Sequence, residues 1–259
     1  VLRADFLNTG TSDAILIRMD ETVILVDAGE ADDYPAISRK LTENGITVID
    51  YLIISHYDND HIGTVSQILQ SYTVKNLYMP DYVRNSNLYS RMMSTLDVRP
   101  DVAVHRPTED VRIDLSYGSL WINPTKLYAP GATLGSDDSH ALEENNYSLI
   151  TSVYFGDVSL LLAGDAEQDR ITEFMETAGV ELSYDVIKIP HHGGYDKALG
   201  NLLRENSGLR YCMVHAGSKG LVEASLVTAM RTSGAAAKFT YDGDIAFATD
   251  GTSMTVNQN

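Results

Sequence analysis

The chain has 259 residues, of which 44% are hydrophobic and 21% charged, so it is long enough to bury a sizeable core. Its formal net charge of -17 argues against a protein that holds nucleic acid on a broad basic surface. The charge is uneven, because six basic residues accompany only five acidic ones between Lys75 and Arg112. A polyanionic partner would therefore need local help, from this segment or from bound divalent cations.

A single cysteine, Cys212, excludes an internal disulfide framework and a cysteine-rich zinc knuckle. It lies in an apolar run, which predicts a buried structural thiol. No stretch of about 18 apolar residues is present, so we expect no transmembrane segment in this chain. Because the chain opens on a strand-like segment without Met, we interpret it as trimmed at its N-terminus. An extracellular or cell-surface location is favoured, and a cytoplasmic one stays open.

Strand and helix patterns alternate through the first half of the chain. Strands are predicted over 3–7, 14–18, 23–26, 51–54 and 75–79, helices over 34–43, 62–69 and 86–96, and several short strands up to residue 128. The loop that follows strand 51–54 matters most, because open α/β sheets usually place their sites at strand ends.

After a polar loop over 131–146, the second half repeats the style of the first. Strands are predicted over 148–155, 158–162, 186–189, 210–214, 238–241, 245–248 and 253–256, and helices over 168–178, 197–205 and 221–232. Two strand-rich halves with helices outside predict two packed sheets that are covered on both faces. We expect residues 1–259 to form a single α/β domain.

Four ligand-type side chains follow the buried strand 51–54. The run from His56 to His61 holds two imidazoles and two carboxylates, the latter from Asp58 and Asp60. Zinc binds histidine nitrogen and carboxylate oxygen, and hydrolytic sites leave a position open for water. Alternation along extended backbone would bring His56 and Asp58 to one metal, while Asp60 and His61 turn towards a second. Capping of the next helix explains Asp60 alone, so the run predicts a metal site.

Two more apolar strands end in ligand-type residues. Strand 158–162 leads to Asp165, and a carboxylate at a strand end can bridge two metals, although Gly-Asp is also an ordinary turn. Strand 186–189 leads to His191 and His192. One of these imidazoles is expected to bind metal, while its neighbour orients a ligand or contacts substrate. His191 is nearer the strand end and is our first choice as the ligand.

These segments, in this order, resemble the metallo-β-lactamase superfamily, and within it the metallohydrolase domain of ComEC-type competence proteins. The run 56–61 resembles the His-x-Asp-x-Asp-His form of the superfamily motif, and the segments 163–165 and 190–193 follow in the expected places. The opening segment 5–17 and the closing segment 241–245 also resemble the family's hairpins. The resemblance implies a four-layer αββα metallo-β-lactamase sandwich, with two mixed β-sheets flanked by helices.

The chain departs from the family pattern at several positions. Asp58 replaces the middle histidine of the general motif, and Asn145 or Asn146 stands where a third histidine is usual. His140 lies a few residues upstream and would be a substitute, although an exposed loop histidine is the plainer interpretation. The late stretch from His215 lacks the family's terminal His-Pro. These asparagines and histidines are candidates for an additional ligand or a substrate contact.

The resemblance implies two unequal metal sites. The tighter one would be formed by Asp60, His61, Asp165 and His191, and the weaker one by His56, Asp58 and the shared Asp165. One or two divalent ions per chain are expected, with zinc first and manganese or iron as alternatives. Water activated by the metals would attack phosphorus or carbonyl carbon. Asp60 and His192 are the expected catalytic residues.

The resemblance favours phosphodiester hydrolysis, with nucleic acid or a phosphorylcholine-type ester as substrate. A fold supports many functions, so two alternatives stay open. One is a weakly active or non-catalytic metal-containing module that binds nucleic acid or a cell-surface ligand. The other is a lactone or β-lactam hydrolase. The oligomeric state is not predicted.

Overall fold

The first sheet combines the N-terminal part of the chain with its C-terminal end. In the computed structural model, which describes residues 1–134, 144–178 and 182–258, this sheet has eight strands. Their spatial order is β17 (Met254–Gln258), β16 (Ile245–Thr249), β1 (Leu2–Phe6), β2 (Ile15–Met19), β3 (Thr22–Val26), β4 (Val48–Ile53), β5 (Thr73–Tyr78) and β7 (Ala103–His105). The strands from β3 to β7 are parallel to one another, and the others pair antiparallel.

The second sheet has seven strands and the same mixed character. Their order is β15 (Ala236–Phe239), β14 (Tyr211–Val214), β13 (Val186–Lys188), β12 (Val158–Leu162), β11 (Ile150–Phe155), β9 (Gly118–Asn123) and β8 (Val111–Leu115). The pairs from β12 to β15 are parallel, and those from β12 to β8 are antiparallel. A separate parallel pair consists of β6 (Tyr82–Arg84) and β10 (Ala132–Leu134).

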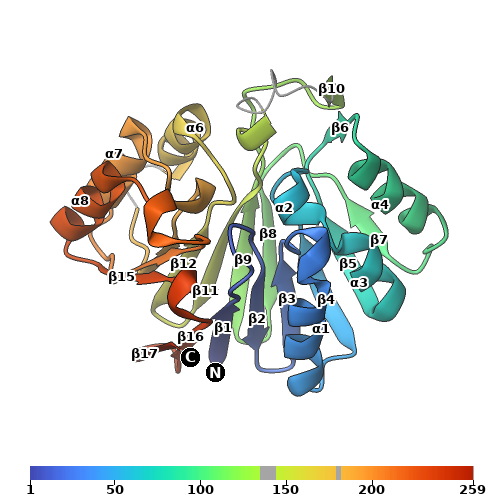
Figure 1. The fold of residues 1–259 in the computed structure, drawn as a ribbon, viewed down its shortest axis with the longest axis horizontal. Coiled ribbons are helices and arrows are strands. Elements are labelled where there is room, and N and C mark those ends of the chain that lie inside the picture. Colours follow the sequence, from blue (N-terminus) through green and yellow to red (C-terminus); the bar gives the residue numbers. More distant parts are fainter. Residues whose placement is uncertain (135–143, 179–181, 259) are drawn as a thin grey trace.

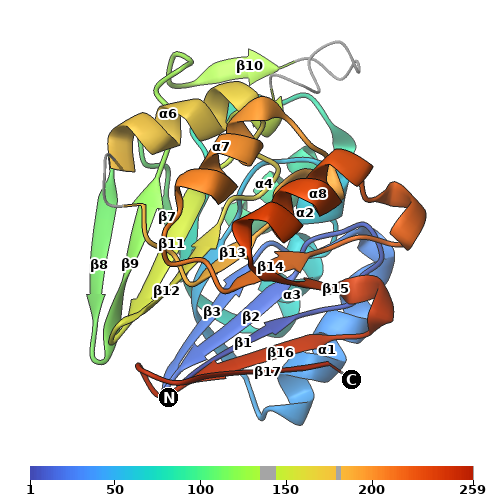
Figure 2. The same ribbon diagram turned by 90° about the vertical axis from the view of Figure 1, so that its left-hand side faces the viewer.

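Helices cover the outer face of each sheet (Figure 1). The first sheet is covered by α1 (Tyr34–Glu43), α3 (Val65–Ser71) and α4 (Asn87–Asp97), and the second by α6 (Gln168–Ala178), α7 (Lys197–Glu205) and α8 (Ala224–Ser233). The short helix α2 (Asn59–Ile62) follows β4. Figure 2 shows the second sheet with its helices turned towards the viewer, and both termini lie at the lower end in both views. The expected α/β class with two mixed sheets flanked by helices is confirmed.

Side chains that alternate along the strands fill the spaces between the layers. In β12, Leu160 and Leu162 pack between the two sheets, whereas Leu161 packs towards the helices of the second sheet. This period of two is the reason why a strand buried on both faces is apolar throughout. Cys212 lies in the same outer layer and is buried, as predicted. Among the described residues, no helix is both long and apolar enough to cross a bilayer.

Several predicted elements differ from the structure in their bounds. The helix expected over 62–69 is broken, because the backbone N–H groups of Gly63 and Thr64 donate to the carbonyls of Gly29 and Ala28 instead of continuing α2. Helix α8 begins at Ala224, after a 3-10 turn over Lys219–Leu221. The strand expected over 238–241 lies at Ala236–Phe239 and is followed by a 3-10 turn.

We predict that the layer between the sheets dominates stability. Ile17 in β2 is fully buried in this layer, so Ile17→Ala should lower the free energy of unfolding by about 2–5 kcal/mol, since it leaves a cavity. Urea unfolding followed by circular dichroism measures the loss. The control Val98→Ala, at a side chain that is 74% exposed, should change it by less than ~0.5 kcal/mol. Equal effects of the two substitutions would contradict the prediction.

Candidate metal centre

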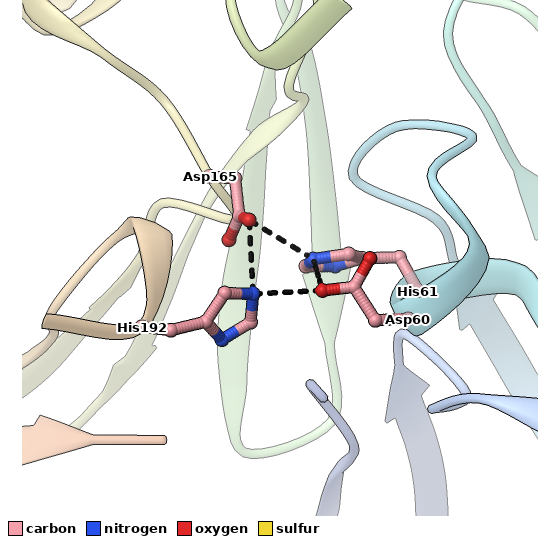
Figure 3. Close-up of side chains that lie close together, drawn as sticks. All are labelled: Asp60, His61, Asp165 and His192. Carbon is pink, nitrogen blue, oxygen red and sulfur yellow. Dashed lines mark ion pairs between the residues drawn. The ribbon is translucent and has the colours of Figure 1, made fainter. Parts of the chain in front are cut away.

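Four ligand-type side chains converge where the parallel strands of both sheets end (Figure 3). One ligand atom from each lies within 4.8 Å of the others. The group consists of two carboxylates and two imidazoles, from Asp60, His61, Asp165 and His192. Its most exposed member is Asp60, with 24% of its side chain accessible, and His61 is fully buried. We call these four residues the ligand group.

Elements from both sheets supply the ligand group. Asp60 and His61 lie on α2, after β4 of the first sheet, whereas Asp165 and His192 follow β12 and β13 of the second. Nε2 of His192 lies 2.8 Å from Oδ2 of Asp60 and 3.0 Å from Oδ2 of Asp165. Nε2 of His61 lies 3.3 Å from the same oxygen of Asp165. The Asp165 carboxylate therefore faces both imidazoles across the junction of the sheets.

Asp27, directly after β3, sets the orientation of His61. Nδ1 of His61 lies 2.9 Å from Oδ2 of Asp27, and because a carboxylate oxygen accepts, Nδ1 is the donor. In the neutral imidazole, Nε2 is then left without a proton and faces the ligand group. Fixing the tautomer in this way is the usual role of a carboxylate behind a metal-binding histidine. Asp27 also accepts hydrogen bonds from the backbone N and the hydroxyl of Ser55, both at 2.7 Å. His61 is thus held in one tautomer and one direction.

Asp165 is held by groups around its carboxylate. The backbone N of His191 donates to Oδ1 of Asp165 at 3.2 Å, and the backbone N of Asp165 donates to Oγ of Ser148 at 3.3 Å. Nζ of the fully buried Lys188 lies 3.5 Å from Oδ1 and donates to the carbonyl of Gly164 at 2.9 Å. These contacts leave Oδ2 directed towards the two imidazoles.

Gly164 lets the chain turn closely past the first sheet into Asp165. Its φ is +54°, in the left-handed region that favours glycine. A Cβ at this position would lie 2.5 Å from Cβ of Ser55 and 3.1 Å from Oγ of Ser148. Both a special backbone conformation and a lack of space therefore require glycine here.

The structure brings His192 into the ligand group and leaves out His191, which the sequence favours as the ligand. Both residues have positive φ values, 50° and 52°, in the 3-10 turn at His191–Gly193. The chain therefore turns at once after β13, and the second imidazole points inwards instead of the first. The side chain of His191 is 45% exposed, and its Nδ1 lies 3.3 Å from Oε1 of Glu167.

His56 and Asp58, the residues expected at the weaker site, lie beside each other but outside the ligand group. Nε2 of His56 lies 3.5 Å from Oδ2 of Asp58, and Nδ1 of His56 lies 3.0 Å from Oγ of Ser55. Oδ1 of Asp58 lies 3.6 Å from the guanidinium group of Arg84. Within the part of the chain that the structure describes, no further ligand-type side chain joins this pair in a metal-sized group.

The other candidates have other surroundings. Nδ2 of Asn145 donates to Oε1 of Glu167 at 3.0 Å, and Oδ1 of Asn146 accepts from the backbone N of Arg170 at 3.2 Å, so both amides support the start of α6. His215 is fully buried, and burial lowers its pKa to about 4, so its imidazole is neutral near pH 7. His140 lies outside the described residues.

Carboxylates make the ligand group attractive to cations. Burial alone would lower the pKa of His61, but Asp165 and Asp27 raise it well above its usual value. At His192, burial also acts to lower the pKa. The nearby Asp165 carboxylate outweighs this effect and raises the pKa of the imidazole to about 10. A proton or a divalent ion satisfies this negative field, and the two compete for the same nitrogen atoms.

Two residues that support the group, Asp13 and Lys188, were missed from the sequence. Lys188 is fully buried and contacts the carboxylate of Asp13, which in turn lies 3.4 Å from Nδ1 of His215 and 3.7 Å from Nδ1 of His192. One sequence feature pointed to Lys188, namely a lysine inside an apolar strand, because lysine is rarely buried without a partner. Nothing local identified Asp13 as that partner.

A family model described as the metallo-beta-lactamase superfamily matches residues 7–207, which include the ligand group. The chain belongs to the metallo-β-lactamase superfamily. This family match confirms the expected class, a metal-dependent hydrolase. The strand ends of both sheets thus carry ligand-type side chains in the order that the family resemblance implies. His192 lies in the ligand group in place of His191.

Two curated relatives confirm the ComEC-type resemblance. ComE operon protein 3 of Bacillus subtilis (strain 168) is 29% identical over 153 residues, which cover 59% of this chain and 18% of the relative. Recombination protein 2 of Haemophilus influenzae is 28% identical over 204 residues, which cover 74% of this chain and 21% of the relative. The chain therefore spans only about a fifth of the length of either relative.

A solved structure with the same fold is the metallo-beta-lactamase fold protein YhfI from Bacillus subtilis. The two structures have a TM-score of 0.58 at 14% sequence identity, and the match covers 99% of each chain. At this identity the likeness shows the metallo-β-lactamase fold and no more.

Gly164→Ala should lower the free energy of unfolding more than the same change at another glycine with a left-handed backbone conformation. Gly45 has a φ of +68° and nothing within 4 Å of an added Cβ, so Gly45→Ala introduces backbone strain without a clash. We expect Gly164→Ala to lower the free energy of unfolding by a further ~1–3 kcal/mol, because Ser55 must move. Parallel urea titrations of the two variants measure the difference, and equal losses would show that the close approach to Ser55 is unimportant.

Proposed function

We propose that this chain is a metal-dependent phosphodiesterase, in which Asp60, His61, Asp165 and His192 hold a divalent ion. The observation that supports this most strongly is the convergence of two imidazoles and two carboxylates, with their ligand atoms within 4.8 Å of one another. Nitrogen and oxygen donors of this kind suit zinc, and manganese or iron are alternatives.

A second observation that favours a bound ion is the lack of hydrogen bonds at two buried donor atoms. Nε2 of His61 and Nε2 of His192 are buried, and neither forms a hydrogen bond of good geometry with any described residue. Buried polar atoms are normally hydrogen-bonded, so two such atoms facing one point favour a ligand between them. Asp27 behind His61 provides the outer support that such sites use.

A bound divalent ion would supply hydroxide from water near neutral pH and offset the charge that develops on the substrate oxygen. Asp60 is the ligand-group member most accessible to solvent, so we assign to its carboxylate the role of accepting a proton from the attacking water. His192, whose Nε2 lies 2.8 Å from Oδ2 of Asp60 and 3.0 Å from Oδ2 of Asp165, would bind the same ion as these two carboxylates. Substrate would approach from the Asp60 side, since His61 and Asp165 are buried.

A phosphodiester of nucleic acid is the substrate class that we favour. The recombination named for the Haemophilus influenzae relative is a process of nucleic acids, whose backbone is a phosphodiester. The net charge of -17 gives no general attraction for such a substrate, so recognition would rest on the ion and on a few nearby cations. A phosphorylcholine-type ester has the same phosphodiester linkage and serves as the alternative in a substrate screen.

Asp60→Ala should abolish both metal retention and hydrolysis. The substitution removes one of four ligands and the proposed proton acceptor, so turnover should fall by at least ~100-fold. Metal content by plasma mass spectrometry and hydrolysis of bis-p-nitrophenyl phosphate with added zinc, manganese or iron are the measurements. Asp32→Ala, at an exposed carboxylate in the 3-10 turn Ala31–Asp33, is the control and should behave as wild type. Normal activity of Asp60→Ala would refute the mechanism, and an inert wild type would favour a binding module.

Asp27→Asn should weaken metal binding without removing a ligand. Asp27 has a φ of +57°, which asparagine tolerates, so the backbone should be kept. The amide cannot accept all the hydrogen bonds from Ser55 and His61, and the preferred tautomer of His61 is lost. We expect metal affinity to fall by roughly 10–100-fold, as for other groups behind metal-binding histidines. Isothermal titration with zinc measures this, and unchanged affinity would count against the orienting role.

A further inference from the structure

A guanidinium group lies against the part of the site that lacks a full set of metal ligands. Arg84, in β6, has only 12% of its side chain exposed. Its NH2 nitrogen lies 3.6 Å from Oδ1 of Asp58, and its NH1 nitrogen contacts Oε2 of Glu144. The carboxylate of Glu144 is fully buried. Arg84 is therefore shared between a buried anion and the carboxylate expected to bind a second metal.

Hydrogen bonds fix this guanidinium relative to the loop after β4. Oη of Tyr82 donates to Oε1 of Glu144 at 2.7 Å and accepts from the backbone N of Tyr57 at 2.8 Å. Tyr57 lies between His56 and Asp58 in the sequence. The pair of Arg84 and Glu144 is thus tied to the same loop that supplies the incomplete half of the site, so its position is part of the fold.

The carboxylate of Asp58 already faces a cation, the guanidinium group of Arg84. One of its oxygens faces His56 at 3.5 Å, and the other faces Arg84 at 3.6 Å. A guanidinium group stays protonated in proteins and has no lone pair to offer a metal. A divalent ion held by His56 and Asp58 would be repelled by this fixed positive charge, most strongly where little water intervenes.

We propose that Arg84 takes the place of a second metal ion, so that the chain binds one divalent ion tightly, at the ligand group. Arg84 neutralises the charge of Asp58 and prevents a second ion from binding to His56 and Asp58. The inference rests on the proposed function for the single ion at the ligand group. The proposal has separate support in Glu144, a fully buried carboxylate that contacts Arg84 and lies outside the ligand group.

The number of bound ions and the affinity for the second ion test this proposal. Arg84→Gln alone would leave Glu144 as an unpaired buried charge, which destabilises the fold, so the main variant is the double substitution Arg84→Gln with Glu144→Gln. Isothermal titration with Mn²⁺, combined with equilibrium dialysis and plasma mass spectrometry, should give one tight ion in the wild type. In the double variant, a second ion should bind at least about tenfold more tightly than it does in the wild type, because the repelling charge is gone.

Two control variants separate charge from structure. Glu144→Gln keeps Arg84 beside Asp58, and Arg84→Lys keeps a positive charge, so both should retain weak binding of the second ion. A wild type that binds two ions with similar affinity would overturn the proposal, as would a double variant with unchanged second-ion affinity. A wild type that binds no ion would instead overturn the proposed metal centre, and this proposal with it.

Discussion

A fully buried ammonium group joins the two halves of the site. Lys188, at the end of β13, contacts Asp13 from the first half of the chain and lies 3.5 Å from Asp165 in the second. Charges are costly to remove from water unless they are paired, and here the pairing crosses the junction between the two sheets. Without this ammonium group two buried carboxylates would repel each other. Together with the backbone N–H of His191, Lys188 faces Oδ1 of Asp165, so that Oδ2 is left for the ligand group.

The site is unequal in a way that this charge arrangement explains. On one side, carboxylates outnumber the fixed cations, and the imidazoles of His61 and His192 attract a proton or an ion. On the other side, Arg84 already faces Asp58. The resemblance to the family implies a tighter and a weaker metal site, and in our proposal Arg84 takes the place of the ion at the weaker one.

The sequence was sufficient to predict the layers and most of the ligand group, but not its details. Apolar strands followed by ligand-type residues identified Asp60, His61 and Asp165, because the pattern and the chemistry are local. The choice between His191 and His192 depends on two consecutive left-handed residues, which no propensity of histidine predicts. The contact of Arg84 with Glu144 joins residues 60 positions apart, and Lys188 is 175 positions from its partner Asp13, so neither contact could be found from local pattern.

The left-handed pair at His191 and His192 has one more consequence. Each residue in this conformation costs of the order of 1 kcal/mol or more, and such strain persists only where surrounding contacts outweigh it. An ion bound through His192 would help to offset that cost, so folding of the turn and occupancy of the site become linked equilibria. The thermal midpoint of the protein would then rise with the concentration of free metal.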